Sequence, residues 1–238
     1  MKKRSVAVII PTYNEKANIK LLIQALTKHQ PTADIYVVDD QSPDGTAQVV
    51  KSLQKTNKKI LLITNPTKGG RGKAVMAGFK QAYNKKKYDI FVEMDADFSH
   101  RPKEVGSLIN QVNCNSAVIG SRYLAESRTV NWPLYRRVFS FITNKMLRLV
   151  LGFKLHDYTN GFRAYPKQAI RLLLKNDLIT QSYFTLSETA LILHQAGFTL
   201  MEVPTVFPNR VRGQSNSNLK ELRNNLKDLL KIKWYYRQ

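Results

Sequence analysis

The chain has 238 residues, of which 43% are hydrophobic, so it can bury a substantial core and global disorder is excluded. Its 38 Lys and Arg against 17 Asp and Glu give a net charge of +21, and its one cysteine excludes an internal disulfide framework and fits a reducing compartment. No apolar run is long enough to span a bilayer, and the short run after the basic N-terminus has no cleavage site behind it, so neither a transmembrane helix nor a secretory signal is predicted.

A positive charge of this size favours polyanionic partners without choosing among them. Nucleic acid, an anionic membrane surface and phosphorylated substrates are all attracted by such a field. The sequence has no zinc-finger spacing, no RNP-like aromatic motif and no basic zipper. Nucleic acid is therefore not the favoured partner.

The first half of the chain alternates apolar, β-branched runs with helical patterns. Strands are predicted at 5–10, 35–38, 60–64, 88–94 and 116–121, and helices at 16–29, from the turn at 41–46 to about 55, at 74–84 and at 102–111. Thr12 or Asn14 is expected to cap the first helix. This order predicts an α/β fold with an open, mostly parallel sheet and right-handed crossovers.

The alternation weakens after Tyr123. Residues 131–151 combine apolar side chains with several Arg and Lys, which predicts an amphipathic helix with a basic face. Further helices are predicted at 167–175, at 187–196 and from 219 to about 233, and a strand at 199–207. No internal repeat or low-complexity linker divides the chain, so residues 1–238 are interpreted as one domain.

Carboxylates follow the predicted strands where those strands end. Asp95 and Asp97 come directly after the strand at 88–94, and such side chains are hard oxygen ligands for Mg²⁺ or Mn²⁺, ions that also bind substrate phosphates. In parallel sheets, ligands collect at the carboxyl ends of the strands. Each nearby residue alone has an ordinary structural explanation, such as a helix cap, but their convergence predicts a site for a metal and a nucleoside diphosphate. The residues after the other two strands are Pro11, Tyr13, Glu15, Asp39 and Asp40.

Several motifs, standing in order, carry a family resemblance. They are Pro-Thr-Tyr-Asn-Glu (11–15), Val-Val-Asp-Asp-Gln-Ser-Pro-Asp-Gly-Thr (37–46), Met-Asp-Ala-Asp-Phe-Ser-His (94–100), Gly-Ser-Arg-Tyr (120–123), Asn-Gly-Phe-Arg-Ala-Tyr (160–165), Glu-Val-Pro (202–204) and Arg210-x-x-Gly213-x-Ser215. From about residue 6 to about residue 218 the chain resembles the inverting GT-A glycosyltransferases. It is most similar to the polyprenol (dolichyl) phosphate mannose synthase branch, which loads a sugar onto a lipid phosphate.

The resemblance implies a GT-A, Rossmann-like sheet flanked by helices, with C-terminal amphipathic helices at a membrane interface. It implies a nucleotide-sugar half at about 1–125 and an acceptor and membrane half at about 126–238. Catalysis would depend on Asp97, Arg122 and Arg136, and Asp95 and Asp97 would bind Mg²⁺ or Mn²⁺. The implied donor contacts are Pro11, Tyr13, Glu15, Val38, Asp40, Met94, Asp95, Ala96 and Arg210, with Met94 and Ala96 acting through the backbone. The implied contacts to the acceptor phosphate are Arg122, Arg136 and Ser140.

Two positions depart from the family pattern. Asn216 stands where the family usually has a lysine, so a cation for the diphosphate is missing there or is supplied by Lys220. Arg71, in the glycine-rich segment 69–73, stands where a small apolar residue is more usual. Both departures bear on the donor, for which the resemblance favours GDP-mannose and leaves UDP-glucose open.

The implied reaction needs no strong base. A phosphate monoester has a second pKa of about 6, so the acceptor, polyprenyl phosphate, is largely a dianion at neutral pH. Its oxygen would attack the anomeric carbon in line and displace the nucleoside diphosphate with inversion, helped by positioning and charge stabilisation. Asp157 is expected either to orient an Arg near the acceptor or to cap a helix. Glu188 is a weaker site candidate, the alternative for it being a buried ion pair.

The lipid acceptor would also explain the charge. Residues 132–139 and 227–237 combine aromatics, aliphatics and cations, a composition that suits helices lying in a membrane interface, although they could instead pack on the core. We therefore expect a cytoplasmic protein bound peripherally to the cytoplasmic face of an anionic membrane. A membrane-protein partner is left open.

Three rival interpretations make different demands on these residues. A saccharide hydroxyl acceptor, in cell-wall or capsule synthesis, would require a base such as Asp97 or Glu188. A basic nucleic-acid-binding module conflicts with the pair Asp95 and Asp97, which would repel phosphate without a metal. A nucleotidyltransferase usually has a glycine-rich basic loop after the first strand, where residues 13–15 stand here.

Overall fold

The computed structural model describes residues 4–180, 184–209, 231–232 and 234–236. The strands are β1 (Val6–Thr12), β2 (Asp34–Asp39), β3 (Ile60–Thr64), β4 (Ile90–Glu93), β5 (Ser116–Ser121), β6 (Arg128–Val130), β7 (Arg163–Pro166), β8 (Thr199–Pro204) and β9 (Val206–Pro208). The helices are α1 (Lys16–His29), α2 (Thr46–Thr56), α3 (Gly70–Asn84), the short 3₁₀ helix η1 (Pro102–Glu104), α4 (Val105–Gln111), α5 (Leu134–Leu151), α6 (Lys167–Leu173) and α7 (Thr185–Gln195).

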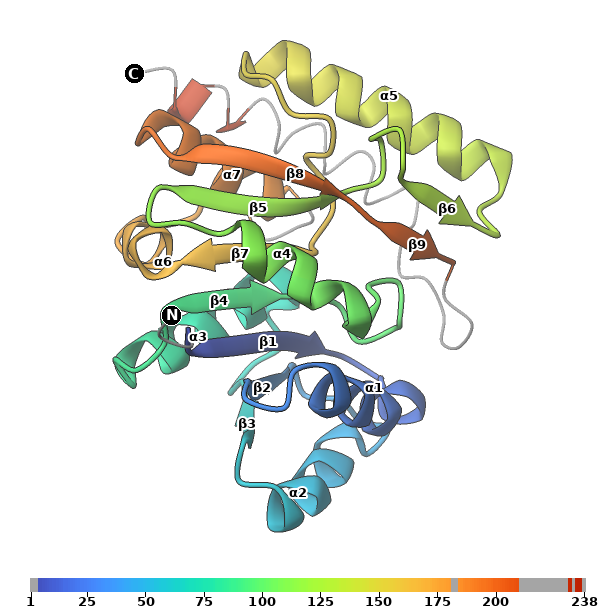
Figure 1. Cartoon of the computed structure of the whole chain (residues 1–238), viewed down its shortest axis with the longest axis vertical. Helices are drawn as coiled ribbons and strands as arrows, with labels where there is room; N and C mark the ends of the chain where they lie inside the picture. Colours follow the sequence, from blue (N-terminus) through green and yellow to red (C-terminus); the bar gives the residue numbers. More distant parts are fainter. Residues whose placement is uncertain (1–3, 181–183, 210–230, 233, 237–238) are drawn as a thin grey trace.

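One large sheet organises these elements, in the order β3-β2-β1-β4-β7-β5-β8. Neighbouring strands run parallel except at β7, which is antiparallel to both β4 and β5. Strands β6 and β9 form a separate two-stranded parallel sheet. Figure 1 shows the large sheet crossing the molecule between α2 at one end and α5 at the other.

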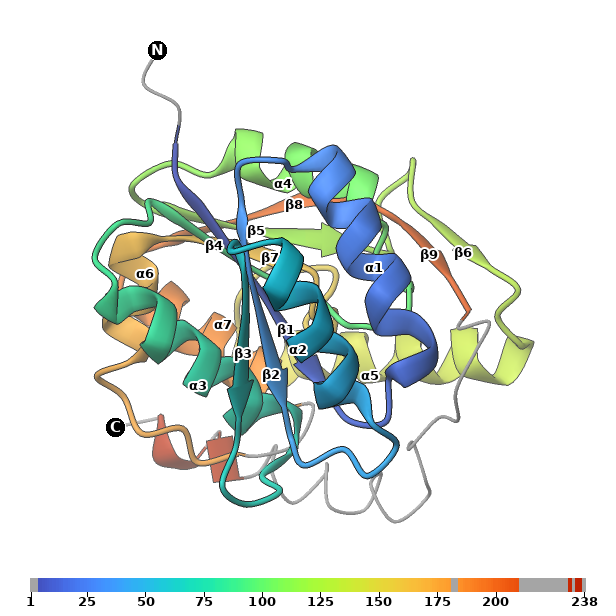
Figure 2. The same cartoon turned by 90° about the horizontal axis from the view of Figure 1, so that it is seen from below.

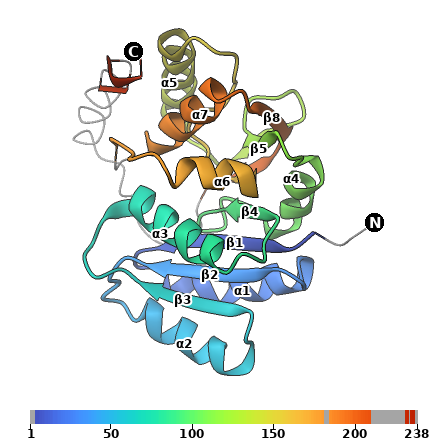
Figure 3. The ribbon, with the colours of Figure 1, turned by 90° about the vertical axis from the view of Figure 1, so that its left-hand side faces the viewer.

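Helices cover both faces of the large sheet. Alternate residues of β1 point to opposite sides, with Val8 and Ile10 in a core shared with α1, α2 and α4, and Ala7 and Ile9 in a core shared with α3, α6 and α7. Figures 2 and 3 show this layering from two further directions. Such a doubly covered sheet explains why its strands are almost continuous apolar runs. The predicted α/β class with a mostly parallel sheet is confirmed.

The expected cap of α1 is wrong. The residue before α1 is Glu15, and its side chain makes no capping hydrogen bond to the helix. The same holds for Thr12 and Asn14 among the described contacts. Instead Asp44, from the loop between β2 and α2, accepts the Lys16 backbone N–H at 2.9 Å. Burial alone would raise the pKa of the Asp44 carboxyl, but hydrogen bonds from Thr46 and Lys16 outweigh this effect and lower it. The cap is therefore supplied from a distant segment.

The second half differs most from the expected elements. The predicted helices at 131–151, 167–175 and 187–196 are present as α5, α6 and α7. The single strand expected at 199–207 is instead divided into β8 and β9, which belong to different sheets. Where the chain changes sheets, Glu104 accepts hydrogen bonds from Thr205 Oγ1 at 2.6 Å and Val206 N at 3.3 Å. Strands β6 and β7 were not predicted, and most of the helix expected from 219 to about 233 lies outside the described residues.

Candidate functional site

The carboxyl ends of β2, β1 and β4 lie side by side. Thr12 pairs with Asp39 across β1 and β2, and Ile9 pairs with Glu93 across β1 and β4. The chain segments that follow these strands therefore leave the sheet at the same edge. The structure thus brings together the three groups of residues that the sequence placed at strand ends, and we call this edge the donor edge.

The turn that carries Asp95 and Asp97 is fixed by His100. The imidazole Nδ1 accepts the Asp95 backbone N–H at 2.9 Å, and Nε2 lies 2.8 Å from the Oδ1 of Asn160, to which it donates. The ring is fully buried and stacks on Phe162. Burial lowers the pKa of His100 although the charges of Asp95 and Asp97 oppose this, so the ring is a neutral hydrogen-bonding support.

The two carboxylates differ in exposure. The Asp95 side chain is 30% exposed, whereas Asp97 is a buried residue. The Asp97 Oδ1 accepts the Ser99 backbone N–H at 3.0 Å. Among the described residues, no group of three or more His, Cys, Asp and Glu side chains is arranged to enclose a cation. Two carboxylates are instead what is expected for an ion that is bound partly by the protein and partly by substrate phosphates. Asp95 and Asp97 therefore fit Mg²⁺ or Mn²⁺ shared with a diphosphate.

Asp40 holds a loop. Its carboxylate accepts the backbone N–H groups of Gly69 and Gly70, the latter at 2.7 Å, and the side-chain amide of Asn65 at 3.0 Å. The segment before α3 is thereby fixed against the end of β2. Contact between Asp40 and a nucleoside stays a prediction, because this carboxylate is already used in shaping the donor edge.

The same loop carries Lys68, which the sequence did not single out. Its Nζ lies 3.6 Å from the centroid of the Tyr13 ring, a cation–π contact at the mouth of the donor edge. Glu15 is occupied locally, because its Oε2 accepts the Asn18 side-chain amide at 2.8 Å. The proposed nucleoside contacts of Tyr13, Glu15 and the neighbouring Pro11 stay predictions.

Three other predicted donor residues have their side chains in the core. Val38 and Met94 are fully buried, and Ala96 is 2% exposed. Only their backbone can reach a ligand, which agrees with the backbone role expected for Met94 and Ala96. Arg210, Asn216 and Lys220 lie outside the described residues.

Arg122 is held by Asp157 at the end of β5. The guanidinium donates Nε to Asp157 Oδ2 and Nη2 to Oδ1, each at 2.7 Å, and Nη2 also donates to Thr159 Oγ1 at 2.6 Å. Asp157 is fully buried; desolvation would raise the pKa of its carboxyl, but the charge and hydrogen bonds of Arg122 lower it. Of the two roles expected for Asp157, orienting an arginine is the one that the structure shows.

Arg122 and Arg136 meet at one indole ring. Their guanidinium carbons lie 5.4 Å and 4.1 Å from the Trp132 ring centroid, and Arg136 Nη1 donates to Asn209 Oδ1 at 2.6 Å. Trp132 is 6% exposed, and within the part of the chain that the structure describes its Nε1 has no hydrogen-bond partner. We call Arg122, Trp132, Arg136 and Ser140 the acceptor cluster. Two guanidinium groups suit a phosphate group.

Ser140 completes the cluster one turn after Arg136 on α5. Its Oγ accepts the Tyr123 O–H at 2.6 Å, and Asn144 donates to its backbone carbonyl at 2.9 Å. Because Tyr123 is the donor in this bond, the Ser140 hydroxyl proton is available to a ligand. Burial raises the pKa of Tyr123, so it remains protonated as a donor at neutral pH. Tyr123 was missed as a site residue although it closes the Gly-Ser-Arg-Tyr motif.

The donor edge and the acceptor cluster are linked through Asn160. Its Oδ1 accepts a hydrogen bond from His100 Nε2, and its Nδ2 donates to the Gly120 carbonyl, two residues before Arg122. The Asn160 backbone N–H also donates to Asp157, the partner of Arg122. Desolvation alone would lower the pKa of Arg122, but the charge of Asp157 outweighs it and raises this pKa. The charge of Asp95 adds a smaller contribution in the same direction. The residues expected to hold a metal and Arg122, expected to hold an acceptor phosphate, are therefore joined by one hydrogen-bond network.

Among the described contacts, Glu188 is not part of this network. It is fully buried and accepts hydrogen bonds from the backbone N–H groups of Ile179 and Thr180, the Thr180 hydroxyl and the Tyr236 hydroxyl. The expected buried ion pair is wrong, since among the described contacts its partners are neutral donors. A base role for Glu188 toward a saccharide hydroxyl has no geometric support.

Comparison with known proteins gives the family. Residues 7–174 match the model of glycosyl transferase family 2. An undecaprenyl-phosphate mannosyltransferase from Micrococcus luteus is 35% identical over 210 residues, covering 88% of this chain and 86% of the relative. A polyprenol monophosphomannose synthase from Mycolicibacterium smegmatis is 36% identical over 220 residues, covering 90% and 82%. The chain is a family 2 glycosyltransferase.

Solved structures confirm the fold of this family 2 glycosyltransferase. A glucosyl-3-phosphoglycerate synthase from Mycobacterium tuberculosis, in complex with Mn²⁺, UDP-glucose and phosphoglyceric acid, matches with a TM-score of 0.66 and 19% identity over 97% of this chain and 80% of that one. A mannosyltransferase from Pyrobaculum calidifontis, in complex with GDP-mannose and Mn²⁺, matches with a TM-score of 0.65 and 18% identity over 99% and 64%. The predicted GT-A fold is confirmed.

Proposed function

We propose that this glycosyltransferase transfers mannose from GDP-mannose to the phosphate of a polyprenyl phosphate, with inversion and with Mg²⁺ or Mn²⁺. The observation that carries the proposal is the acceptor cluster, in which Arg122 and Arg136 both contact the Trp132 indole. Arg136 and Ser140 belong to α5, a helix with an exposed apolar surface. Both relatives named above are enzymes of polyprenyl phosphate mannosylation by their names. The GDP-mannose complex of the Pyrobaculum enzyme supports the nucleotide.

On the acceptor side, the chain orients a nucleophile that is already charged. Arg122, locked by Asp157, and Arg136, stacked on Trp132, hold the lipid phosphate, and Ser140 donates a hydrogen bond to it. One phosphate oxygen attacks the anomeric carbon while the bond from that carbon to the nucleoside diphosphate breaks. Because the phosphate needs no deprotonation, the burial of Glu188 away from the site is expected under this proposal and is unfavourable to a hydroxyl acceptor.

On the donor side, the chain fixes the sugar nucleotide by its strand ends. Asp95 and Asp97 would hold the divalent ion, which when bound offsets the negative charge of the leaving diphosphate. His100 and Asn160 keep the turn that carries both carboxylates in place. The loop held by Asp40, with Lys68 over Tyr13, lines the region where the nucleoside would lie.

Helix α5 supports contact with a membrane surface. Of its 18 residues only Asn144 and Leu147 are buried. The exposed large apolar side chains on it are Leu134, Tyr135, Val138, Phe139, Phe141, Ile142, Met146 and Leu149. Arg137, Lys145 and Arg148 are also exposed on this helix. A helix of this composition binds in the headgroup region of an anionic leaflet.

We therefore place the enzyme peripherally on the cytoplasmic face of the membrane, with α5 in the interface. Among the described residues, no helix combines the length and apolar character needed to cross a bilayer. Arg136 and Ser140 belong to the same helix, so a lipid phosphate at the membrane surface would reach them while its prenyl chain stays in the bilayer.

The deciding experiment uses polyprenyl phosphate, Mn²⁺ and a panel of labelled sugar nucleotides. We expect label from GDP-mannose to enter the organic phase as a lipid-linked product that is labile to mild acid, as a glycosyl phosphate should be. Transfer from UDP-glucose alone would overturn the choice of donor. Transfer only to a water-soluble saccharide would overturn the choice of acceptor.

A further inference from the structure

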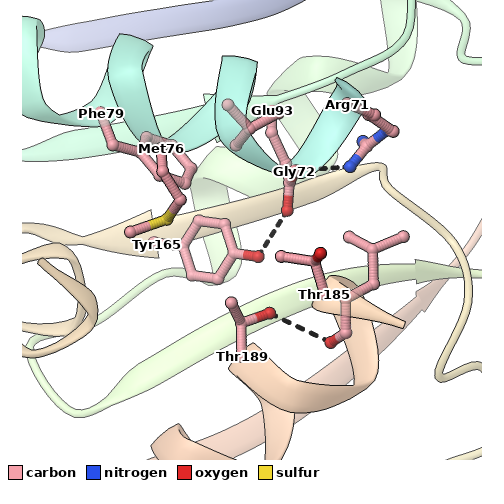
Figure 4. A pocket seen from close by; sticks show the side chains of 10 residues that line it. Arg71, Gly72, Met76, Phe79, Glu93, Tyr165, Thr185 and Thr189 are labelled. Carbon is pink, nitrogen blue, oxygen red and sulfur yellow. Dashed lines mark hydrogen bonds and ion pairs between the residues drawn. The ribbon is translucent and has the colours of Figure 1, made fainter. Parts of the chain in front are cut away.

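Arg71 reaches from the first turn of α3 to the end of β4. Its Nε donates to Asp95 Oδ1 at 2.8 Å, its Nη1 donates to Glu93 Oε2 at 3.2 Å, and its Nη2 donates to the Gly161 carbonyl at 3.3 Å. Figure 4 shows the guanidinium beside Glu93, in the wall of a small pocket that Tyr165 also lines. One cation thus bridges a strand end, the metal-binding turn and the segment before β7.

Glu93 anchors this arginine from the core. Its side chain is 3% exposed, and its second oxygen accepts the Tyr165 O–H at 2.6 Å. A buried carboxylate is costly unless it is paired and hydrogen-bonded, and here Arg71 and Tyr165 satisfy it from two sides. Burial, together with the charge of Glu93, raises the pKa of Tyr165, so its hydroxyl stays protonated as the donor.

Gly161 makes room for the guanidinium. A Cβ atom at this position would lie 1.9 Å from Arg71 Nη2 and 2.7 Å from its central carbon, so any larger residue would displace the arginine. The arginine is therefore held by three segments and has little freedom to turn away from Asp95. Its charge is a permanent part of the site.

We propose that Arg71, anchored by Glu93, is a positioning residue that fixes the Asp95 carboxylate and lowers the affinity of Asp95 and Asp97 for a divalent cation until the donor diphosphate is bound. The inference rests on the proposed function, which places a metal and a diphosphate at this pair. A guanidinium 2.8 Å from one metal ligand repels a second cation. The same guanidinium attracts a diphosphate, so metal and donor bind cooperatively.

The test measures binding of Mn²⁺ alone, without nucleotide, by the electron paramagnetic resonance signal of the free ion. Arg71→Leu removes a positive charge and should tighten Mn²⁺ binding about tenfold, whereas Glu93→Gln removes a negative charge and should weaken it about tenfold. Opposite shifts are expected because the two charges have opposite signs. A purely structural role would weaken binding in both variants.

A second titration repeats the measurement with GDP. In the wild type GDP should raise the Mn²⁺ affinity, and in Arg71→Leu the factor by which it does so should shrink about tenfold. Arg171→Leu, which removes the same charge from an exposed position on α6, is the matched control and should change neither value. Circular dichroism establishes that each variant is folded. If Arg71→Leu is not folded, Arg71→Gln takes its place, with the same expected shifts.

Two outcomes overturn the inference in distinguishable ways. Mn²⁺ binding by the folded Arg71 variant that is equal to or weaker than that of the wild type would remove the role of Arg71 and leave the metal site intact. No Mn²⁺ binding by the wild type, with or without GDP, would overturn the proposed metal site and this inference with it.

Discussion

The donor edge and the acceptor cluster are built in different ways. At the donor edge, Asp40 and Asp97 are held by backbone N–H groups, Asp40 by those of Gly69 and Gly70 and Asp97 by that of Ser99, while Asp95 is paired with Arg71. In the acceptor cluster, side chains hold side chains, as Asp157 holds Arg122 and Trp132 makes cation–π contacts with both arginines.

The difference means that the geometry of the donor edge depends mainly on the backbone, whereas that of the acceptor cluster depends on side-chain pairs. Backbone contacts make the donor edge part of the sheet and its loops, so its geometry follows from the fold. The acceptor cluster depends on pairs of side chains from the segments that follow β5 and precede β7 and from α5 with the residues just before it. Each pair can be changed without redirecting the chain. Substitutions should therefore act mainly on chemistry at one side and on acceptor recognition at the other.

The largest expected effect is at Asp97. Asp97→Ala removes one of two proposed metal ligands, and we expect mannosyl transfer to fall at least about a thousandfold, because charge stabilisation of the leaving group is lost. Asp97→Asn retains an oxygen that can accept the Ser99 N–H and serves as the folded control with the same direction of effect. Wild-type turnover by the alanine variant with Mn²⁺ present would contradict the metal assignment.

The next largest effect is expected at Asp157, which acts on the acceptor side by orienting Arg122. Asp157→Asn leaves Arg122 without its charged partner in a buried environment, which costs about 3 kcal/mol of unfolding free energy. With Arg122 less well oriented, the KM for polyprenyl phosphate should rise more than the KM for GDP-mannose. Equal changes in both values would break the proposed division between the two sides.

The same variant gives a pH test. The folded pKa of Asp157 lies below the ordinary value of 3.8, since Arg122 outweighs the opposing desolvation. The stability that this carboxylate contributes is therefore present above about pH 4 and is lost as the pH falls through the folded pKa. Asp157→Asn should have a flatter decline of melting temperature in acid than the wild type. An unchanged acid profile would show that the pair contributes no pH-dependent stability.

The same contrast between backbone and side-chain contacts explains how much of each side could be predicted from the sequence. The donor edge follows from local motifs and a topological rule, so Asp95, Asp97 and Asp40 were correctly placed at strand ends. The sequence does not predict what those side chains bind, because Asp40 holds a loop about thirty residues further along the chain. Nothing in the sequence except its charge marks Lys68 as a site residue. The prediction of the α1 cap was wrong for the same reason, because the capping side chain, Asp44, comes from another loop.

The acceptor side was predictable only where the resemblance named residues. Arg122, Arg136 and Ser140 were carried over by position, but nothing in their spacing indicates that Trp132 joins the two arginines. The antiparallel strand β7 was missed because it is only four residues long, yet it determines where residues 157–161 lie. Short buried strands of this kind give no clear periodicity.

A fourth prediction concerns α5 and the membrane. Leu134 and Leu149 are 75% and 83% exposed, and changing both to Glu should weaken binding to anionic vesicles at least about tenfold by removing apolar contact and adding like charge. Leu21→Glu, at an exposed leucine of α1, is the matched control. Vesicle binding should also fall with salt, because exposed charges are screened. No loss of binding in the α5 variant would contradict the proposed interface.

The smallest expected effect is at Tyr123. Tyr123→Phe removes the hydroxyl that donates to Ser140 at 2.6 Å, a bond worth about 1 kcal/mol. Without this donor the Ser140 hydroxyl can turn its proton to other acceptors, so the KM for polyprenyl phosphate should rise about fivefold while the Mn²⁺ affinity stays unchanged. Ser140→Ala should give a similar rise, and the double variant should add little to either single change, because both residues act through one hydrogen bond to the phosphate. Fully additive effects would show that Tyr123 acts on the acceptor by another route, such as its contact with Arg122.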